Sequence, residues 1–169
     1  MTISMYQASV PAFVKGLTNL KAILEKAAAH AQAQKIDETV FVTARLYPNM
    51  LPLSKQIQIA SDTARGAAAR LAGNEPPSME DNEKTLADLI ARVDRTLDYV
   101  KPFTAAQIDG SETKVITRPV RGQPKTSTGL NFLLQYALPN FYFHSATAYA
   151  ILRHNGVEVG KSDFLGVLD

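Results

Sequence analysis

Histidine is the residue type most suited to chemistry near neutral pH, and His144 is the most informative of the three histidines. It lies in an aromatic-rich segment that predicts a helix, with Asn140 four residues before it and Thr147 three residues after it. Residues at these spacings share one helix face. A buried imidazole needs partners for its ring nitrogens. Two interpretations follow: a core histidine satisfied by local hydrogen bonds, or a ligand or general base that faces a pocket between helices.

An earlier helical segment offers two polar residues that could meet His144. Gln56 lies beside the apolar stripe of that segment, whereas Asp62 lies nearly opposite the stripe at 3.6 residues per turn. Transition metals usually take three or more ligands, mostly His, Asp or Glu. His144 and Asp62 are the candidate metal ligands, and Asp62 would need a rotated helix to reach the imidazole. The candidate ligand-binding residues of the expected cleft are Tyr47, Gln56, Asn140, Tyr142 and His144.

Four long helical segments must position these residues. Apolar residues recur at three- and four-residue spacings over 4–34, 54–71, 81–100 and 128–153. The connections between them are modest in length. The pattern predicts an all-α, up-and-down four-helix bundle, with residues 1–169 forming a single domain. The cleft is expected between the second and fourth long helices.

Capping residues predict where these helices begin and end. Ser54 is the expected N-cap of the second helix, which ends at Gly73. Ser78, with Asp81 three residues later, resembles a capping box and predicts the start of the third helix. The stripe of the second helix is rich in alanine, so either a neighbouring helix approaches closely or a cleft remains open there.

Residues 103–128 differ in character from the bundle. Val115–Val120, interrupted by Arg118 and Pro119 and followed by Gly122, predicts a short β-hairpin or an extended excursion between the third and fourth helices. It is the most basic local stretch, with Lys114, Arg118, Arg121 and Lys125. These charges indicate either a solvated strand edge or an anion-binding surface. The lack of an accompanying aromatic or glycine-rich cradle favours the strand edge.

Composition excludes several classes of function. The 169 residues are 46% hydrophobic, which is too apolar for a disordered chain. The sequence has no cysteine, which rules out disulfides, iron–sulfur clusters, thiolate zinc sites and a cysteine nucleophile. A net charge of +2 gives no reason to expect nucleic acid or an anionic membrane as the main partner. No motif for a serine hydrolase, a zinc protease, a phosphate loop or a dinucleotide site is present. The sequence also has neither a signal-peptide pattern nor a membrane-spanning stretch, so we expect a cytoplasmic protein.

The sequence resembles a bacterial family called domain of unknown function 1993. The resemblance covers essentially the whole chain, and it is carried by residues 1–6, 44–50, 56–62, 69–73, 140–157 and 163–166. That family is similar to the wider DinB/YfiT-like group. The group implies a four-helix bundle that is often dimeric. Its better-known relatives hold a divalent metal with three histidines, and some act as thiol-dependent transferases.

The resemblance extends to individual ligand positions. His144 matches the second histidine of a pair on the last helix of the group, and the first falls on Asn140. The group's histidine on the second helix falls near residues 60–62, where this sequence has none. The implied cofactor is a divalent transition metal such as Zn, Ni or Fe, at a site that has lost two of three histidines.

Three functions are compatible with this pattern. The first is a binder of a small molecule, in the cleft between the second and fourth helices, with an eroded metal site. The second is a metal-dependent enzyme of the transferase or hydrolase type that uses His144. The third is a structural or interaction protein. In each case a homodimer is the expected assembly.

Overall fold

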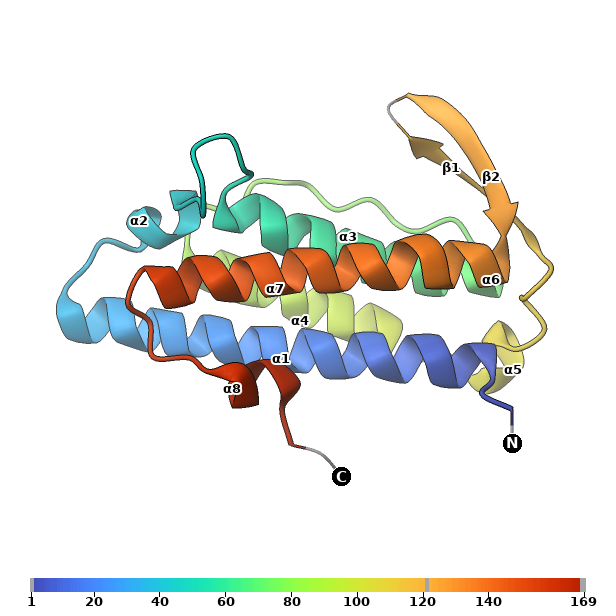
Figure 1. Cartoon of the computed structure of the whole chain (residues 1–169), viewed down its shortest axis with the longest axis horizontal. Coiled ribbons are helices and arrows are strands. Elements are labelled where there is room, and N and C mark those ends of the chain that lie inside the picture. The colour runs from blue at the N-terminus through green and yellow to red at the C-terminus, as the bar shows by residue number, and fades with distance from the viewer. Residues whose placement is uncertain (1, 121, 168–169) are drawn as a thin grey trace.

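Helices make up most of the molecule, for which a computed structural model describes residues 2–120 and 122–167. The long helices are α1 (Met5–Gln34), α3 (Leu53–Ala72), α4 (Leu86–Val100) and α7 (Leu138–His154). The shorter elements are α2 (Glu38–Thr43), α5 (Ala105–Ile108), β1 (Val115–Val120), β2 (Gln123–Thr128), α6 (Gly129–Phe132), the π-helix η1 (Leu133–Ala137) and α8 (Lys161–Leu165). The long helices lie along one axis and the β-hairpin projects from one end (Figure 1). The predicted all-α bundle with a hairpin before its last long helix is confirmed.

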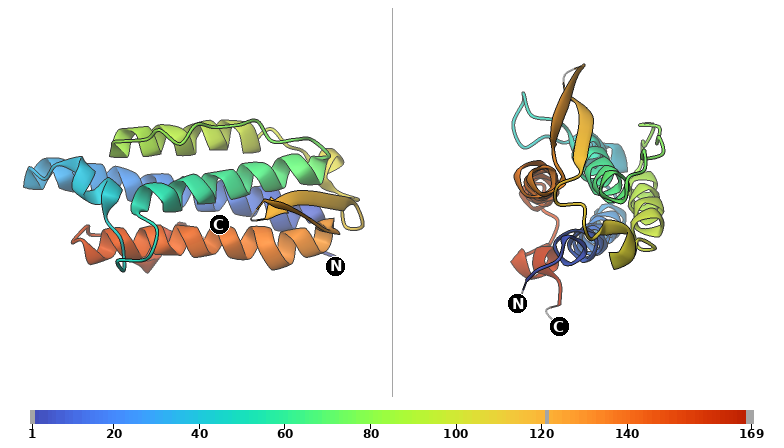
Figure 2. Two further views of the ribbon diagram at one scale, coloured as in Figure 1. Left: turned by 90° about the horizontal axis from the view of Figure 1, so that it is seen from above. Right: turned by 90° about the vertical axis from the view of Figure 1, so that its right-hand side faces the viewer.

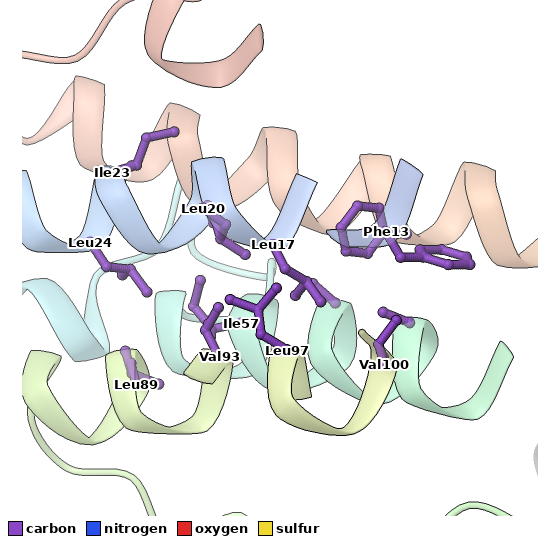
Figure 3. Packing of buried hydrophobic residues seen from close by; sticks show 14 of the residues in the cluster. Phe13, Leu17, Leu20, Ile23, Leu24, Ile57, Leu89, Val93, Leu97 and Val100 are labelled. Atoms are coloured by element: carbon purple, nitrogen blue, oxygen red, sulfur yellow. The ribbon is translucent and has the colours of Figure 1, made fainter. Parts of the chain in front are cut away.

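The core lies between the long helices. Phe13, Leu17 and Leu24 of α1 are fully buried at helical spacing and face apolar residues of α4 (Figure 3). Helix α3 packs against both α4 and α7, and the end-on view in Figure 2 shows it between them. Its buried stripe includes Ala60 and Ala64, which are small enough to let neighbouring helices approach closely. The polar residues of α3 are therefore held against the polar residues of α7.

The helix starts differ from the predictions at two places. Helix α3 begins at Leu53 after an N-cap at Pro52, so Ser54 lies inside the first turn. Helix α4 begins at Leu86, and the predicted start at Ser78 is wrong. A reciprocal capping box formed by Thr85 and Asp88 satisfies the first free N–H groups of α4. The segment 74–84 has no regular secondary structure. It contacts α3 through the Lys55–Asp81 ion pair and α4 through the bond from Arg92 to the Glu80 carbonyl.

The hairpin and the last long helix form one continuous unit. β1 pairs antiparallel with β2 from Val115↔Thr128 to Val120↔Gln123. The hydroxyl of Thr128 then caps α6, which runs through η1 into α7. Arg121, one of the predicted basic residues, lies outside the described residues. Across the described part of the chain, no helix combines the length and the hydropathy that a membrane span requires.

Candidate functional site

The imidazole of His144 is held by a hydrogen-bond relay between α7 and α3. His144 is 9% exposed, and its Nδ1 lies 2.7 Å from Oε1 of Gln56. The Nε2 amide of Gln56 donates to the Leu51 carbonyl at 2.9 Å. The residue pair that the sequence predicted to meet is therefore brought together.

The relay fixes which nitrogen of His144 carries a proton. The side-chain nitrogen of Gln56 donates to the Leu51 carbonyl, so the atom of Gln56 that faces the ring is its amide oxygen. This oxygen can only accept a hydrogen bond from the ring. Nδ1 is then the protonated nitrogen, and Nε2 keeps its lone pair. Burial lowers the pKa of His144 below the ordinary value of 6.5, which favours this neutral form. The ring thus presents an acceptor, the state suited to a hydrogen-bonding, basic or metal-binding role.

A second polar contact continues the line of His144 along the same two helices. The Nδ2 amide of Asn140 donates to the hydroxyl oxygen of Thr63 at 2.8 Å. We call Gln56, Thr63, Asn140 and His144 the α3–α7 seam. Asn140 lies one helical turn before His144, as its spacing predicted. The seam contains polar side chains of both helices in an otherwise apolar contact.

The carboxylate of Asp62 is engaged elsewhere. Its Oδ1 accepts from Arg65 and from Arg92, each at 2.8 Å. Arg92 is fully buried in α4 and also contacts Glu83 at 2.9 Å and Asp81 at 3.1 Å. We call Asp62, Arg65, Asp81, Glu83 and Arg92 the Arg92 network. The Arg92 network links the segment 74–84, which precedes α4, to both α3 and α4.

The donor set around His144 does not fit a metal centre with three protein ligands. Orientation of one ring nitrogen by an amide oxygen is typical of metal-binding histidines. However, no group of three His, Asp or Glu side chains within residues 2–120 and 122–167 is arranged so that it could hold a metal ion. Asp62 is paired with two guanidinium groups, so its role as a ligand stays a prediction.

The two tyrosines of the predicted cleft lie apart from the α3–α7 seam. Tyr47 belongs to the connection between α2 and α3 and is 63% exposed. Tyr142 lines a pocket formed with α1 and α8, on another face of α7. Burial raises the pKa of Tyr142 above its ordinary value of 10.0. No contact joins Tyr47 or Tyr142 to His144 among the contacts of the described residues. That these tyrosines form walls of a cleft around His144 stays a prediction.

A hollow of about 390 Å³ lies between α3, η1 and β1. We call this hollow the basic groove. It shares Thr63 with the α3–α7 seam, and its lining includes Arg65, Arg70 and Arg118. Arg65 and Arg70 were not predicted as site residues from the sequence. Arg118 was predicted only as part of the basic stretch, for which a strand edge was favoured over an anion-binding surface.

Arg118 and Tyr136 form one wall of the basic groove. The Cζ atom of Arg118 lies 3.3 Å from the centre of the Tyr136 ring, which is a cation–π contact. The aromatic partner that the sequence lacked near the basic stretch thus comes from η1. The contact holds the guanidinium over the groove.

Arg65 is the most deeply placed cation of the basic groove. Its side chain is 7% exposed, and Nη2 is paired with Asp62. Within the described residues, its Nε and Nη1 atoms are buried without a hydrogen-bond partner. Burial lowers the pKa of Arg65, although Asp62 acts in the opposite direction. Buried N–H groups without partners are uncommon in folded proteins, and they mark a place where an acceptor would bind favourably.

The lowered pKa of His144 predicts a pH dependence of stability. Below about pH 6.5, His144 binds a proton more readily in the unfolded chain than in the folded chain. Its contribution to the free energy of unfolding is therefore complete above that pH and decreases as the pH falls. We expect urea unfolding to show the native protein losing stability relative to His144→Gln as the pH is lowered. The histidines common to both proteins cancel in this difference. Equal pH profiles for the two proteins would contradict the buried, neutral imidazole.

Comparisons with known proteins agree with this fold. A family model described as "Domain of unknown function (DUF1993)" matches residues 5–165. The chain is also similar to the crystal structure of a DinB family member protein from Shewanella denitrificans, with 45% identity and a TM-score of 0.90. That similarity covers 96% of this chain and 92% of the other. A search of curated proteins found no match.

Proposed function

The chain belongs to the family called domain of unknown function 1993 and has the fold of a DinB family member, and from the arginines that line its basic groove we propose that it binds a small anionic molecule. The ligand lies in the basic groove between α3 and η1, beside the α3–α7 seam. The sequence predicted a small molecule in a cleft with Tyr47, Gln56, Asn140, Tyr142 and His144, and none of these five residues lines the basic groove. The ligand carries a carboxylate or phosphate group that the arginines of the groove recognise.

The observation that carries the proposal is the unsatisfied guanidinium of Arg65. A buried N–H group without an acceptor destabilises the protein by about 1–3 kcal/mol, and more when the group is charged. Two N–H-bearing atoms of Arg65 are in this position while the side chain lines the groove. An oxyanion supplies acceptors in the planar arrangement that a guanidinium binds best.

The charge of the basic groove also favours an anion. Three arginines line it, and Asp62 is the one acidic residue among the residues that do. The carboxylate of Asp62 is already shared between Arg65 and Arg92. Its negative charge is therefore not available to neutralise Arg70 or Arg118, and a bound anion would complete the balance.

The test is a calorimetric titration of the protein with inorganic phosphate, succinate and citrate, with glycerol as the neutral probe. We expect saturable binding of at least one anion, no binding of glycerol, and weaker binding at higher ionic strength. Arg118→Met should weaken binding by about tenfold, because it removes a charge-assisted contact without opening the core. Arg65→Met should weaken it at least as much.

The matched control is Arg95→Met. Arg95 lies on α4 and lines another hollow, which it shares with Arg65 but not with Arg118. Unchanged binding by Arg95→Met together with weakened binding by Arg118→Met supports the basic groove. The reverse pattern, or no saturable binding of any of the three anions, would overturn the proposal.

A metal-dependent enzyme is the second candidate function, and the relay from Leu51 through Gln56 to His144 favours it. The relay leaves Nε2 as an oriented lone pair, which one coordination bond or one proton transfer can use. Metal analysis of the purified protein distinguishes the candidates. A stoichiometric divalent metal that disappears in His144→Ala while the fold remains intact would replace the anion-binding function by this one. The predicted homodimer stays a prediction.

A further inference from the structure

A separate pocket of about 300 Å³ lies between α1, α7 and α8. Figure 1 shows α8 alongside α1, and Phe164 and Leu165 of α8 line one side of the pocket. The walls are mainly apolar and include Leu20, Phe141, Tyr142, Phe164 and Leu165. It has no lining residue in common with the basic groove. Enclosed space with apolar walls and few polar groups is typical of sites for small organic molecules.

One polar group inside this pocket has no partner. The hydroxyl of Ser145 is buried, and no hydrogen bond to it is formed by the described residues. Ser145 itself is 3% exposed and lines the pocket. A serine in a helix commonly donates to a backbone carbonyl in the preceding turn, and Thr147 nearby does so to Phe143. The hydroxyl of Ser145 is therefore free to donate to an acceptor atom of a molecule in the pocket.

The rim of the pocket carries a positive charge. Lys15 is exposed, donates to the Val167 carbonyl at 3.0 Å, and is the one charged side chain in the lining. Helix α8 is attached to α1 by two contacts. Asn19 donates to the Phe164 carbonyl at 3.0 Å, and Lys26 forms an ion pair with Asp163 at 2.7 Å. The pocket therefore combines an apolar interior with an ammonium group at its opening and no acid.

We propose that this pocket is a second binding site, and that it takes a small carboxylic acid with an apolar tail. The tail occupies the space between Leu20 and Phe141, the carboxylate pairs with Lys15, and the Ser145 hydroxyl donates to a ligand oxygen. Aromatic side chains such as Phe141 and Phe164 provide a large contact area for the tail. A doubly charged polar anion does not fit this pocket, because its second charge would be buried against apolar walls.

The experiment is a calorimetric titration with octanoate and, as a neutral probe of similar length, 1-octanol. We expect octanoate to bind with one site per chain. Lys15→Gln should weaken octanoate binding at least about threefold, as loss of a near-surface ion pair does, and leave 1-octanol binding unchanged. The control Lys101→Gln removes the same charge at the end of α4, away from the pocket, and should change neither affinity.

A filling variant tests whether both probes use this pocket. Ala12 lines the pocket from α1 and is partly exposed, so Ala12→Leu fills space without disturbing the core. We expect it to abolish binding of both probes, while phosphate binding and its response to Arg118→Met stay as in the native protein. Octanoate binding that is absent in the native protein, or that Ala12→Leu and Lys15→Gln leave unchanged, would overturn this site without affecting the basic groove.

Discussion

Replacing Arg92 by methionine is expected to lower the free energy of unfolding by about 3–5 kcal/mol at pH 7, because it removes the nearest cation from the buried Glu83 carboxylate. Arg92 is fully buried, and the Glu83 side chain that it contacts is 1% exposed. Gln58 also donates to Glu83 at 2.8 Å, but an amide cannot replace the lost charge. Urea unfolding monitored by circular dichroism measures the change. The matched control is Arg95→Met on the same helix. Because the Arg95 side chain is 56% exposed, this replacement should lower the free energy of unfolding by less than about 1 kcal/mol.

The pH dependence of this loss provides a second check. Burial by itself raises the pKa of Glu83, but hydrogen bonds from Arg92 and Gln58 outweigh it and bring the pKa below the ordinary value of 4.5. In the native protein, the ionised Glu83 carboxylate therefore stabilises the fold above about pH 4.5, and this stabilisation is lost as the pH falls through the pKa of Glu83 in the folded state. Without Arg92, burial should raise the pKa of Glu83. The stability gap between Arg92→Met and the native protein should therefore narrow as the pH is lowered towards 4.5. A small and pH-independent gap would contradict the structural role of the Arg92 network.

Replacing Gly129 by alanine is expected to destabilise the junction between β2 and η1 by about 1–3 kcal/mol or more. Gly129 is buried, and a Cβ there would overlap the backbone carbonyl oxygen of Ser111. The backbone at this point is also fixed, because the Gly129 N–H donates to the Lys114 carbonyl at 2.8 Å and the Leu130 N–H donates to the Glu112 carbonyl at 3.0 Å. The clash involves backbone, so a side-chain rotation cannot relieve it.

Gly160→Ala is the matched control for Gly129→Ala. Gly160 has an ordinary φ of −130°, and the nearest atom to an added Cβ is the Ser162 hydroxyl oxygen at 3.8 Å. Thermal unfolding should therefore place Gly160→Ala within about 1 kcal/mol of the native protein. Because the junction positions Tyr136, Gly129→Ala should also weaken anion binding in the basic groove. Equal stability of the two variants would show that the junction can shift freely.

The architecture could be predicted from periodicity, because each long helix buries an apolar stripe. The start of α4 could not be read in the same way. Two capping patterns compete there, and the one at Thr85 is used while the one at Ser78 lies just after two prolines. The π-helix η1 had no sequence signal, although it carries Tyr136 into the groove.

The candidate site was only partly predictable. The meeting of Gln56 and His144 followed from helix faces, because both residues lie at the contact between α3 and α7. The burial of Arg65 and Arg92 did not follow, because a charged residue on a helix is usually solvated unless a partner from a distant segment covers it. One signal was present: Arg92 falls within the apolar stripe of α4, next to Val93. For Arg118, the aromatic partner is distant in sequence, so local composition favoured a solvated strand edge.

The most direct test of anion binding in the basic groove is NMR of the arginine Nε–H groups during a phosphate titration. We expect the Nε–H signals of Arg65 and Arg118 to shift together and saturate at a single midpoint, while those of Arg95 and Arg153 stay in place. Shifts that grow linearly at all arginines, or saturable shifts that spare Arg65, would contradict it.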